Sequence, residues 1–273
     1  MMSGAVVFTP ADAQGIAGLT LSNPGKLNAL SVVMWRELRA HMARLNAQPQ
    51  GVRVVVVAGE GGQFASGGDI EEFPQFRFDA STLARFHEED VRPALAAMLD
   101  CDLPLVAQID GACIGGGLEI AACCDIRIAG TGARFGVPIA KLGFPLAPAE
   151  LEVVAQVIGP TVLRELLIEA RVLDAQEALV RGLVTRVVAD AQVAHEARAT
   201  AERIAALSPQ ALRLNKQALR RFASRPGSSA AERAEKLGLE VRRLRAGLAA
   251  IDLAELGDRA AEAESRRTAL TSS

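Results

Sequence analysis

Two glycine-rich stretches and one glutamate are the residues of this 273-residue chain whose types and spacing could do chemistry. The first stretch, residues 110–119, places three consecutive glycines between two apolar runs and ends at Glu119. Glycine allows backbone angles closed to other residues, and the first N–H groups of a following helix have no partner within it. Such groups can hold a phosphate or a reaction's oxyanion, with Glu119 transferring protons. The alternative interpretation is a tight turn followed by a surface glutamate.

A second glycine stretch strengthens the chemical interpretation. Residues 64–70 read Phe-Ala-Ser-Gly-Gly-Asp-Ile and follow the β-branched apolar run of residues 52–58. A short run of this kind predicts a strand buried on both faces. Two strands that each end in a glycine turn could supply one backbone N–H apiece to a single carbonyl oxygen.

Short predicted strands alternate with predicted helices, which indicates an α/β layer architecture. The predicted strands cover residues 5–9, 16–21, 52–58, 105–109, 126–129 and 183–188, and the predicted helices include 31–47, 81–99 with a break at Pro93, and two or three between 149 and 179. Residues 71–80 and 135–138 are predicted as loops. Beyond residue 190 the pattern predicts only amphipathic helices, over 193–207, 209–222 and 230–248.

Composition excludes several classes of protein. Half of the residues are hydrophobic and the net charge is −2, so a large core is expected without attraction to nucleic acid or an anionic membrane. No apolar run is long enough to span a membrane, and the N-terminus does not resemble a secretory signal. The four cysteines (Cys101, Cys113, Cys123 and Cys124) are interpreted as buried side chains in a reducing cytoplasm, and the three histidines (His41, His87 and His195) as solvated side chains rather than metal ligands.

Four motifs together resemble those of the crotonase, or enoyl-CoA hydratase/isomerase, superfamily. They are residues 23–30 (Asn-Pro-Gly-Lys-Leu-Asn-Ala-Leu), 64–70, 111–127 and 133–138 (Ala-Arg-Phe-Gly-Val-Pro), in the family's order over about residues 5–220. The resemblance implies a spiral of β-β-α units over residues 1–190. It also implies a C-terminal helical region, 191–264, that builds a homotrimer or a dimer of trimers. The tail at 265–273 is predicted to be disordered because it is a chain terminus.

The resemblance also implies a substrate and a set of site residues. The substrate is an acyl thioester of coenzyme A, which arrives as part of the substrate, and no metal or other cofactor is implied. The thioester oxygen would lie between the N–H groups of Gly68 and Gly116, with Glu119 as the acid–base residue. The other residues expected at the substrate are Lys26, Ala65, Ser66, Gly67, Asp69, Ile70, Gly115 and Ile139, although Lys26 could equally be a solvated turn residue and Asp69 could simply hold its turn. Phe73, Phe76 and Phe78 are expected as pocket walls or as plain packing.

One departure from the family pattern limits the assignment of the reaction. Hydratases of the family carry a second glutamate directly after the Phe-Gly-x-Pro stretch, and that position is Ile139 here. Glu150 and Glu152 could fold back toward the site, or could be carboxylates favoured by a helix N-terminus. The sequence therefore predicts an enoyl-CoA hydratase-like lyase. The alternatives are an enoyl-CoA isomerase, a thioester hydrolase, a decarboxylase, or an acyl-CoA-binding protein with little catalysis.

Overall fold

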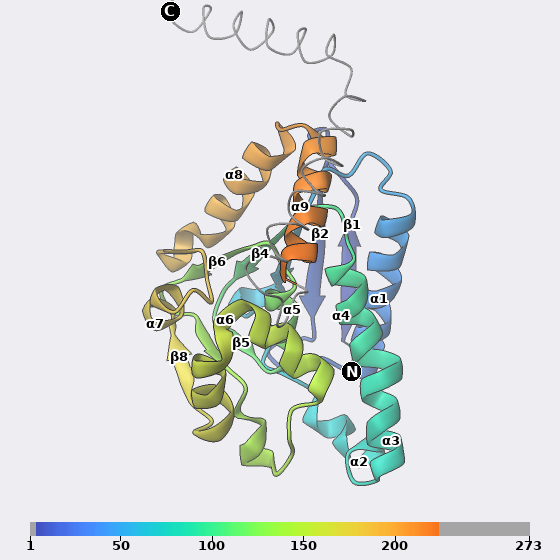
Figure 1. Cartoon of the computed structure of the whole chain (residues 1–273), viewed down its shortest axis with the longest axis vertical. Helices are drawn as coiled ribbons and strands as arrows, with labels where there is room; N and C mark the ends of the chain where they lie inside the picture. The colour runs from blue at the N-terminus through green and yellow to red at the C-terminus, as the bar shows by residue number, and fades with distance from the viewer. Residues whose placement is uncertain (1–3, 224–273) are drawn as a thin grey trace, which may run out of the picture. The chain divides into compact units, whose positions relative to one another are not determined.

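The computed structural model describes residues 4–223 of the chain (Figure 1). By its internal contacts the chain divides into one compact unit that ends at Lys216 and another that begins at Gln217. The helix predicted at 230–248, the tail at 265–273 and much of the region predicted for trimerisation lie outside the described residues. The predicted domain boundaries and the oligomeric role of that region stay predictions.

A six-stranded sheet forms the centre of the first unit. Its strands lie in the order β1 (Ala5–Thr9), β2 (Ile16–Ser22), β3 (Val54–Gly59), β4 (Leu105–Ile109), β6 (Ile126–Gly130) and β9 (Arg186–Val188). The first pair is antiparallel and the remaining pairs are parallel. Strands β3 and β4 consist almost wholly of apolar residues because parallel strands are covered on both faces. All six predicted strands are present, although the last is shorter than predicted.

A second, smaller sheet contains three strands that the sequence did not reveal. These are β5 (Ala112–Ile114), β7 (Arg134–Gly136) and β8 (Val172–Asp174), in that order. The prediction of a loop over 135–138 is therefore wrong at its start. Strands of three residues are too short to show the alternation on which a sequence-based assignment depends.

Helices cover both faces of the main sheet, which confirms the α/β layer architecture (Figure 1). Helix α1 (Val32–Ala47) packs beside α4 (Arg92–Leu99) and buries the predicted face of Met34, Leu38, Met42 and Leu45. Helix α8 (Val193–Ala205) places Ala197, Ala201 and Ala205 against Ile16, Val54, Val106 and Ile128 of the sheet. The other helices are α5 (Gly116–Ala122), α6 (Pro148–Ile168), α7 (Ala175–Val180) and α9 (Pro209–Ala223).

The prediction of a loop over residues 71–80 is wrong, because most of this stretch is helical. A 3-10 turn over Ile70–Glu72 leads into α2 (Phe73–Phe76), and α3 (Ala80–Arg85) follows shortly after. The Asp79 side chain caps α3 by accepting hydrogen bonds from the N–H groups of Ser81 and Thr82. A widened helical turn over Phe86–Val91 joins α3 to α4. His87 lies in this widened turn, and its side chain is largely buried.

The motif at residues 23–30 folds into a turn held by the side chain of Asn28. Asn28 is 3 % exposed and has a φ of 57°, in the left-handed region. Its amide nitrogen donates to the carbonyls of Glu60 and Gln63 at 2.8 and 2.7 Å, and its Oδ1 accepts from the N–H of Asn23 at 3.1 Å. Asn28 therefore fastens this turn to the loop that follows β3.

Substitution Asn28→Ala is expected to lower the free energy of unfolding by about 2–4 kcal/mol. The change leaves three backbone groups without their partner and puts alanine in a left-handed conformation. Urea unfolding measures the effect, with Asn215→Ala at an exposed position of α9 as the matched control. Equal stability of the two variants would show that the turn does not depend on Asn28.

Candidate active site

The two glycine stretches meet at one place in the fold. The N–H of Ala65 donates to the carbonyl of Ala112 at 2.8 Å, and the N–H of Ile114 donates to the carbonyl of Ala65 at 2.9 Å. A Cβ atom added at Gly117 would lie 2.7 Å from the Ala65 carbonyl oxygen, closer than real Cβ atoms come. The two turns that the sequence predicted as partners are therefore in direct contact.

Gly68 and Gly116 both line a single cavity next to this contact. Gly116 is the first residue of α5, where the N–H groups have no acceptor within the helix. A Cβ atom at Gly116 would lie 2.8 Å from both Leu30 and Trp35, and one at Gly68 would lie 3.3 Å from Phe73. Glycine is thus required at Gly116 by packing alone. The predicted binding of a thioester oxygen by the N–H groups of these two glycines stays a prediction.

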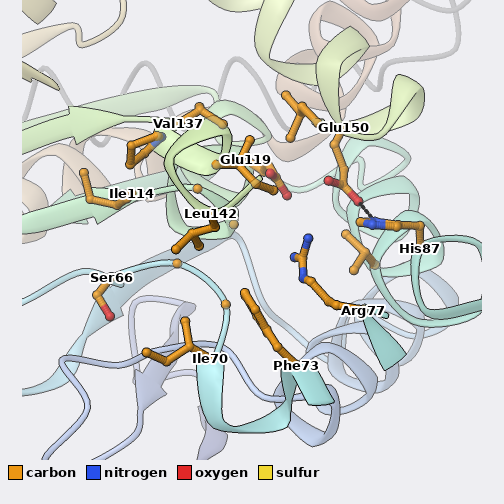
Figure 2. Close-up of a pocket in the computed structure, with 18 of the residues that line it drawn as sticks. Ser66, Ile70, Phe73, Arg77, His87, Ile114, Glu119, Val137, Leu142 and Glu150 are labelled. Carbon is orange, nitrogen blue, oxygen red and sulfur yellow. Dashed lines mark hydrogen bonds and ion pairs between the residues drawn. The ribbon is translucent and has the colours of Figure 1, made fainter. Parts of the chain in front are cut away.

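The cavity has a volume of about 260 Å³ and a mainly apolar wall (Figure 2). Its apolar lining includes Trp35, Ile70, Phe73, Phe86, Val91, Ile114, Val137, Ile139, Leu142 and Leu146. The charged and ionisable residues of the lining are Arg77, His87, Glu119, Lys141 and Glu150. An apolar cavity with a few converging polar groups is typical of a small-molecule site.

Glu119 is 3 % exposed and points into this cavity from α5 (Figure 2). Burial raises the pKa of its carboxyl well above the ordinary value of 4.5, and the nearby charge of Glu150 raises it further. The guanidinium of Arg77 acts in the opposite direction. A carboxyl group in these surroundings keeps its proton to higher pH and can act as a general acid.

Glu150 reaches the same cavity from the first turn of α6, so it folds back toward the site. Its side chain is buried, and its Oε1 lies 2.5 Å from Nδ1 of His87. The interpretation of His87 as a solvated side chain is wrong, because 14 % of the side chain is exposed and it lines the cavity. Glu152, the other glutamate considered from the sequence, is exposed and does not line the cavity.

Arg77 is a residue of the cavity that the sequence analysis did not single out. It is 9 % exposed, and Figure 2 shows its guanidinium pointing into the cavity on the side of Glu119 and His87. Burial lowers the pKa of Arg77, partly offset by the negative charges of Glu150 and Glu119. Its Nε and Nη1 atoms have no hydrogen-bond partner among the described residues.

The predicted site residues divide into those that line the cavity and those that do not. The lining contains Ser66, Gly67, Gly68, Ile70, Gly115, Gly116, Glu119 and Ile139, and it leaves out Lys26, Ala65 and Asp69. The Nζ atom of Lys26 lies 2.7 Å from carboxylate oxygens of both Asp69 and Glu71, and Ala65 is fully buried. The predicted binding of coenzyme A by these residues, like the catalytic role of Glu119, stays a prediction.

The three phenylalanines expected as pocket walls behave differently from one another. Phe73 lines the cavity, whereas Phe78 is 77 % exposed. Phe76 stacks on Phe86 with a centroid distance of 4.1 Å, so it supports the wall from behind.

Two features are absent from residues 4–223. In this part of the chain, no group of three or more His, Cys, Asp or Glu side chains is arranged to hold a metal ion. Within the same range, no helix combines the length and apolar character needed to cross a membrane. The four cysteines are buried free thiols, as predicted.

Comparison with known proteins identifies the family. Residues 11–241 match the family described as enoyl-CoA hydratase/isomerase. This chain belongs to the enoyl-CoA hydratase/isomerase family. The resemblance and the crotonase-like fold class stated from the sequence are thereby confirmed.

Individual relatives agree with this assignment. The chain is 35 % identical over 216 residues to the "Probable enoyl-CoA hydratase" of Rhizobium meliloti, covering 77 % of this chain and 80 % of that protein. It is 29 % identical over 206 residues to the short-chain-enoyl-CoA hydratase of Clostridium acetobutylicum, covering 76 % and 78 %. The crystal structure of an enoyl-CoA hydratase/carnithine racemase from Magnetospirillum magneticum aligns with a TM-score of 0.77 and 39 % identity, covering 86 % of each chain.

The buried carboxyl of Glu119 has a consequence for stability. The pKa of Glu119 is higher in the folded protein than in the unfolded chain. Protonation of Glu119 therefore stabilises the folded protein at low pH, and this contribution to the free energy of unfolding is lost as the pH rises above about 4.5. Glu119→Gln removes the free-energy cost of ionising this buried carboxyl group. The variant is expected to exceed the natural protein in free energy of unfolding at neutral pH, with a smaller difference near pH 4.5.

Urea unfolding across this pH range measures the difference, and Glu152→Gln, which changes an exposed glutamate two residues after Glu150, serves as the control. A difference that does not change with pH would show that Glu119 titrates normally.

Proposed function

We propose that this protein adds water to the double bond of an enoyl thioester of coenzyme A. The single observation that carries the proposal is the convergence of Glu119 and Glu150 on the cavity that Gly68 and Gly116 line. Two carboxylates beside an oxyanion hole are what hydration requires, because a proton must leave water, another must reach carbon, and charge must rest on the thioester oxygen.

The oxyanion hole activates the substrate. When the oxygen atom of water attacks the β carbon, the electrons of the double bond move toward the thioester and negative charge develops on its oxygen. The N–H groups of Gly68 and Gly116 donate hydrogen bonds to that oxygen. Each preorganised donor of this kind contributes about 3–4 kcal/mol in the transition state.

The two glutamates divide the proton transfers. Glu150 accepts the proton that water loses, and its contact with His87 fixes the direction of its carboxylate. Glu119, whose pKa is raised by burial, gives its proton to the α carbon. The product is the 3-hydroxyacyl thioester, and the proton on Glu150 returns to Glu119 through water before the next turnover. Hydrogen and oxygen balance, because one water molecule is consumed.

Glu150 also accounts for the missing family glutamate. Ile139 lines the cavity, but its side chain is apolar and cannot transfer a proton. The carboxylate of Glu150 enters the cavity from α6, which follows the short 3-10 helix Pro138–Leu142 that contains Ile139. In this proposal Glu150 supplies the second carboxylate from a later position in the chain, and hydration does not require a glutamate at position 139.

The remaining properties follow from the same proposal. Coenzyme A enters as part of the substrate and no resident cofactor takes part. The name of the Clostridium acetobutylicum relative, a short-chain-enoyl-CoA hydratase, favours a short acyl group. We also propose a place in fatty acid metabolism. We expect a homotrimer or a dimer of trimers in the cytoplasm.

Mass spectrometry of crotonyl-CoA after incubation with the purified protein tests the proposal. The expected result is a gain of one water, with the oxygen derived from labelled water when the solvent is enriched in oxygen-18. Release of free coenzyme A would indicate hydrolysis instead, and loss of carbon dioxide from a malonyl-type thioester would indicate decarboxylation. A change in retention time without a change in mass would indicate isomerisation.

A further inference from the structure

Arg77 is a buried cation whose hydrogen-bonding groups are unused. It is 9 % exposed, and its Nε and Nη1 atoms are shut off from solvent without a hydrogen-bond partner among the described residues. Buried polar groups in native proteins are nearly always paired, and an unpaired one calls for a specific explanation. The proposed hydration mechanism assigns no role to this guanidinium.

Four aromatic rings hold the guanidinium in place. Its Cζ atom lies 4.2 Å from the ring centroid of Phe73 and 5.1 Å from that of Phe144, with Phe76 and Phe86 at 5.9 and 6.0 Å. We call these four phenylalanines the aromatic collar. Aromatic faces attract a cation without accepting conventional hydrogen bonds from its N–H groups. The collar therefore fixes the position of Arg77 and leaves its donors for another group.

The two glutamates of the cavity do not supply that group. Both act on Arg77 electrostatically, yet neither accepts a hydrogen bond from its Nε or Nη1 atom. The carboxylate of Glu150 is engaged by His87 at 2.5 Å. A guanidinium that served only as their counter-ion would be expected to form the short, charge-assisted hydrogen bonds that such pairs make.

The position of Arg77 points to the acyl end of the substrate. Figure 2 shows the guanidinium between Phe73 and the glutamates, inside the cavity. Phe73 contacts Arg77 and also stands at the oxyanion turn, where a Cβ atom on Gly68 would lie 3.3 Å from its ring. Phe73 therefore lies beside both the guanidinium and the turn proposed to bind the thioester oxygen.

We infer that Arg77 binds a carboxylate on the acyl group, so that the protein prefers the coenzyme A thioester of a short dicarboxylic acid. A guanidinium forms charge-assisted hydrogen bonds with a carboxylate, and the apolar collar strengthens the pairing by excluding water. The inference rests on the proposed acyl-CoA site. It concerns which substrate binds there and does not depend on which reaction follows.

Binding of two saturated thioesters tests the inference without any chemistry. Glutaryl-CoA and pentanoyl-CoA have five-carbon acyl chains and differ at the terminal group, and neither has a double bond to hydrate. Titration calorimetry with the full chain is expected to give about tenfold to a hundredfold tighter binding of glutaryl-CoA. Arg77→Met should abolish that preference, while Arg77→Lys, which retains the charge, should restore part of it.

A second cation of the same cavity provides the control. Lys141 lines the cavity but is exposed, and Lys141→Met should leave the ratio of the two affinities unchanged. Equal affinities in the natural protein, or a preference that survives in Arg77→Met, would overturn the inference. Failure of both thioesters to bind would overturn it together with the acyl-CoA site. A preference for glutaryl-CoA without hydration of any enoyl thioester would uphold the inference and contradict the proposed function alone.

Discussion

Glu119→Gln is expected to lower kcat for hydration of crotonyl-CoA by about 10²–10⁴-fold. Glutamine keeps the shape of the side chain but has no proton to give to the α carbon. Glu119 is buried in the cavity and its pKa is raised. Among the described residues that line the cavity, only Glu150 offers another carboxyl group. Steady-state kinetics, followed by the loss of the enoyl thioester absorbance, measures the effect.

Binding must be separated from catalysis in this variant. Affinity for the saturated thioester butyryl-CoA should stay within about threefold of the natural value, because the oxyanion hole and the apolar wall are unchanged. A variant that hydrates crotonyl-CoA at the natural rate would remove Glu119 from the mechanism. A variant that no longer binds butyryl-CoA would give it a structural role.

Glu150→Gln is expected to reduce kcat by about 10²–10⁴-fold as well, whereas Glu152→Gln should change it less than about twofold. The two glutamates lie two residues apart on α6, but the carboxyl group of Glu150 is buried in the cavity and that of Glu152 is exposed. The pair therefore separates an effect of the site from an effect of charge near the start of the helix. Similar rates for both variants would contradict the assignment of Glu150.

The contact between His87 and Glu150 adds a finer test. His87 touches the carboxylate rather than a reacting atom of the substrate, so it is a positioning residue in this proposal. His87→Gln, which can still donate a hydrogen bond, should retain more activity than His87→Ala, and the shape of the pH profile of kcat should change in both. Identical pH profiles in the natural protein and both variants would show that His87 only packs against Glu150.

Much of the fold was predictable because the signals were local. The apolar runs at 52–58 and 105–109 became the buried strands β3 and β4, and the two glycine stretches became the paired turns of the site. The stretch at 71–80 was misjudged although it carried helix signals. Pro74 stands in the first turn of α2, and Asp79 is a good capping residue for α3.

The parts of the site that the sequence did not reveal depend on contacts between distant segments. His87 and Glu150 are 63 residues apart, and only the packing of α6 near the widened turn before α4 brings them together. Arg77 showed no charged partner in the sequence because its neighbours are aromatic rings from three different segments. Neither His87 nor Arg77 follows a spacing rule, so periodicity and motifs could not single them out.

The most direct test of the proposed mechanism is a crystal structure of Glu119→Gln with 3-hydroxybutyryl-CoA bound. The proposal predicts that the thioester oxygen accepts hydrogen bonds from the N–H groups of Gly68 and Gly116, and that the 3-hydroxyl group lies within hydrogen-bond distance of the Glu150 carboxylate. A thioester oxygen turned away from the two glycines, or a hydroxyl group out of reach of Glu150, would contradict it.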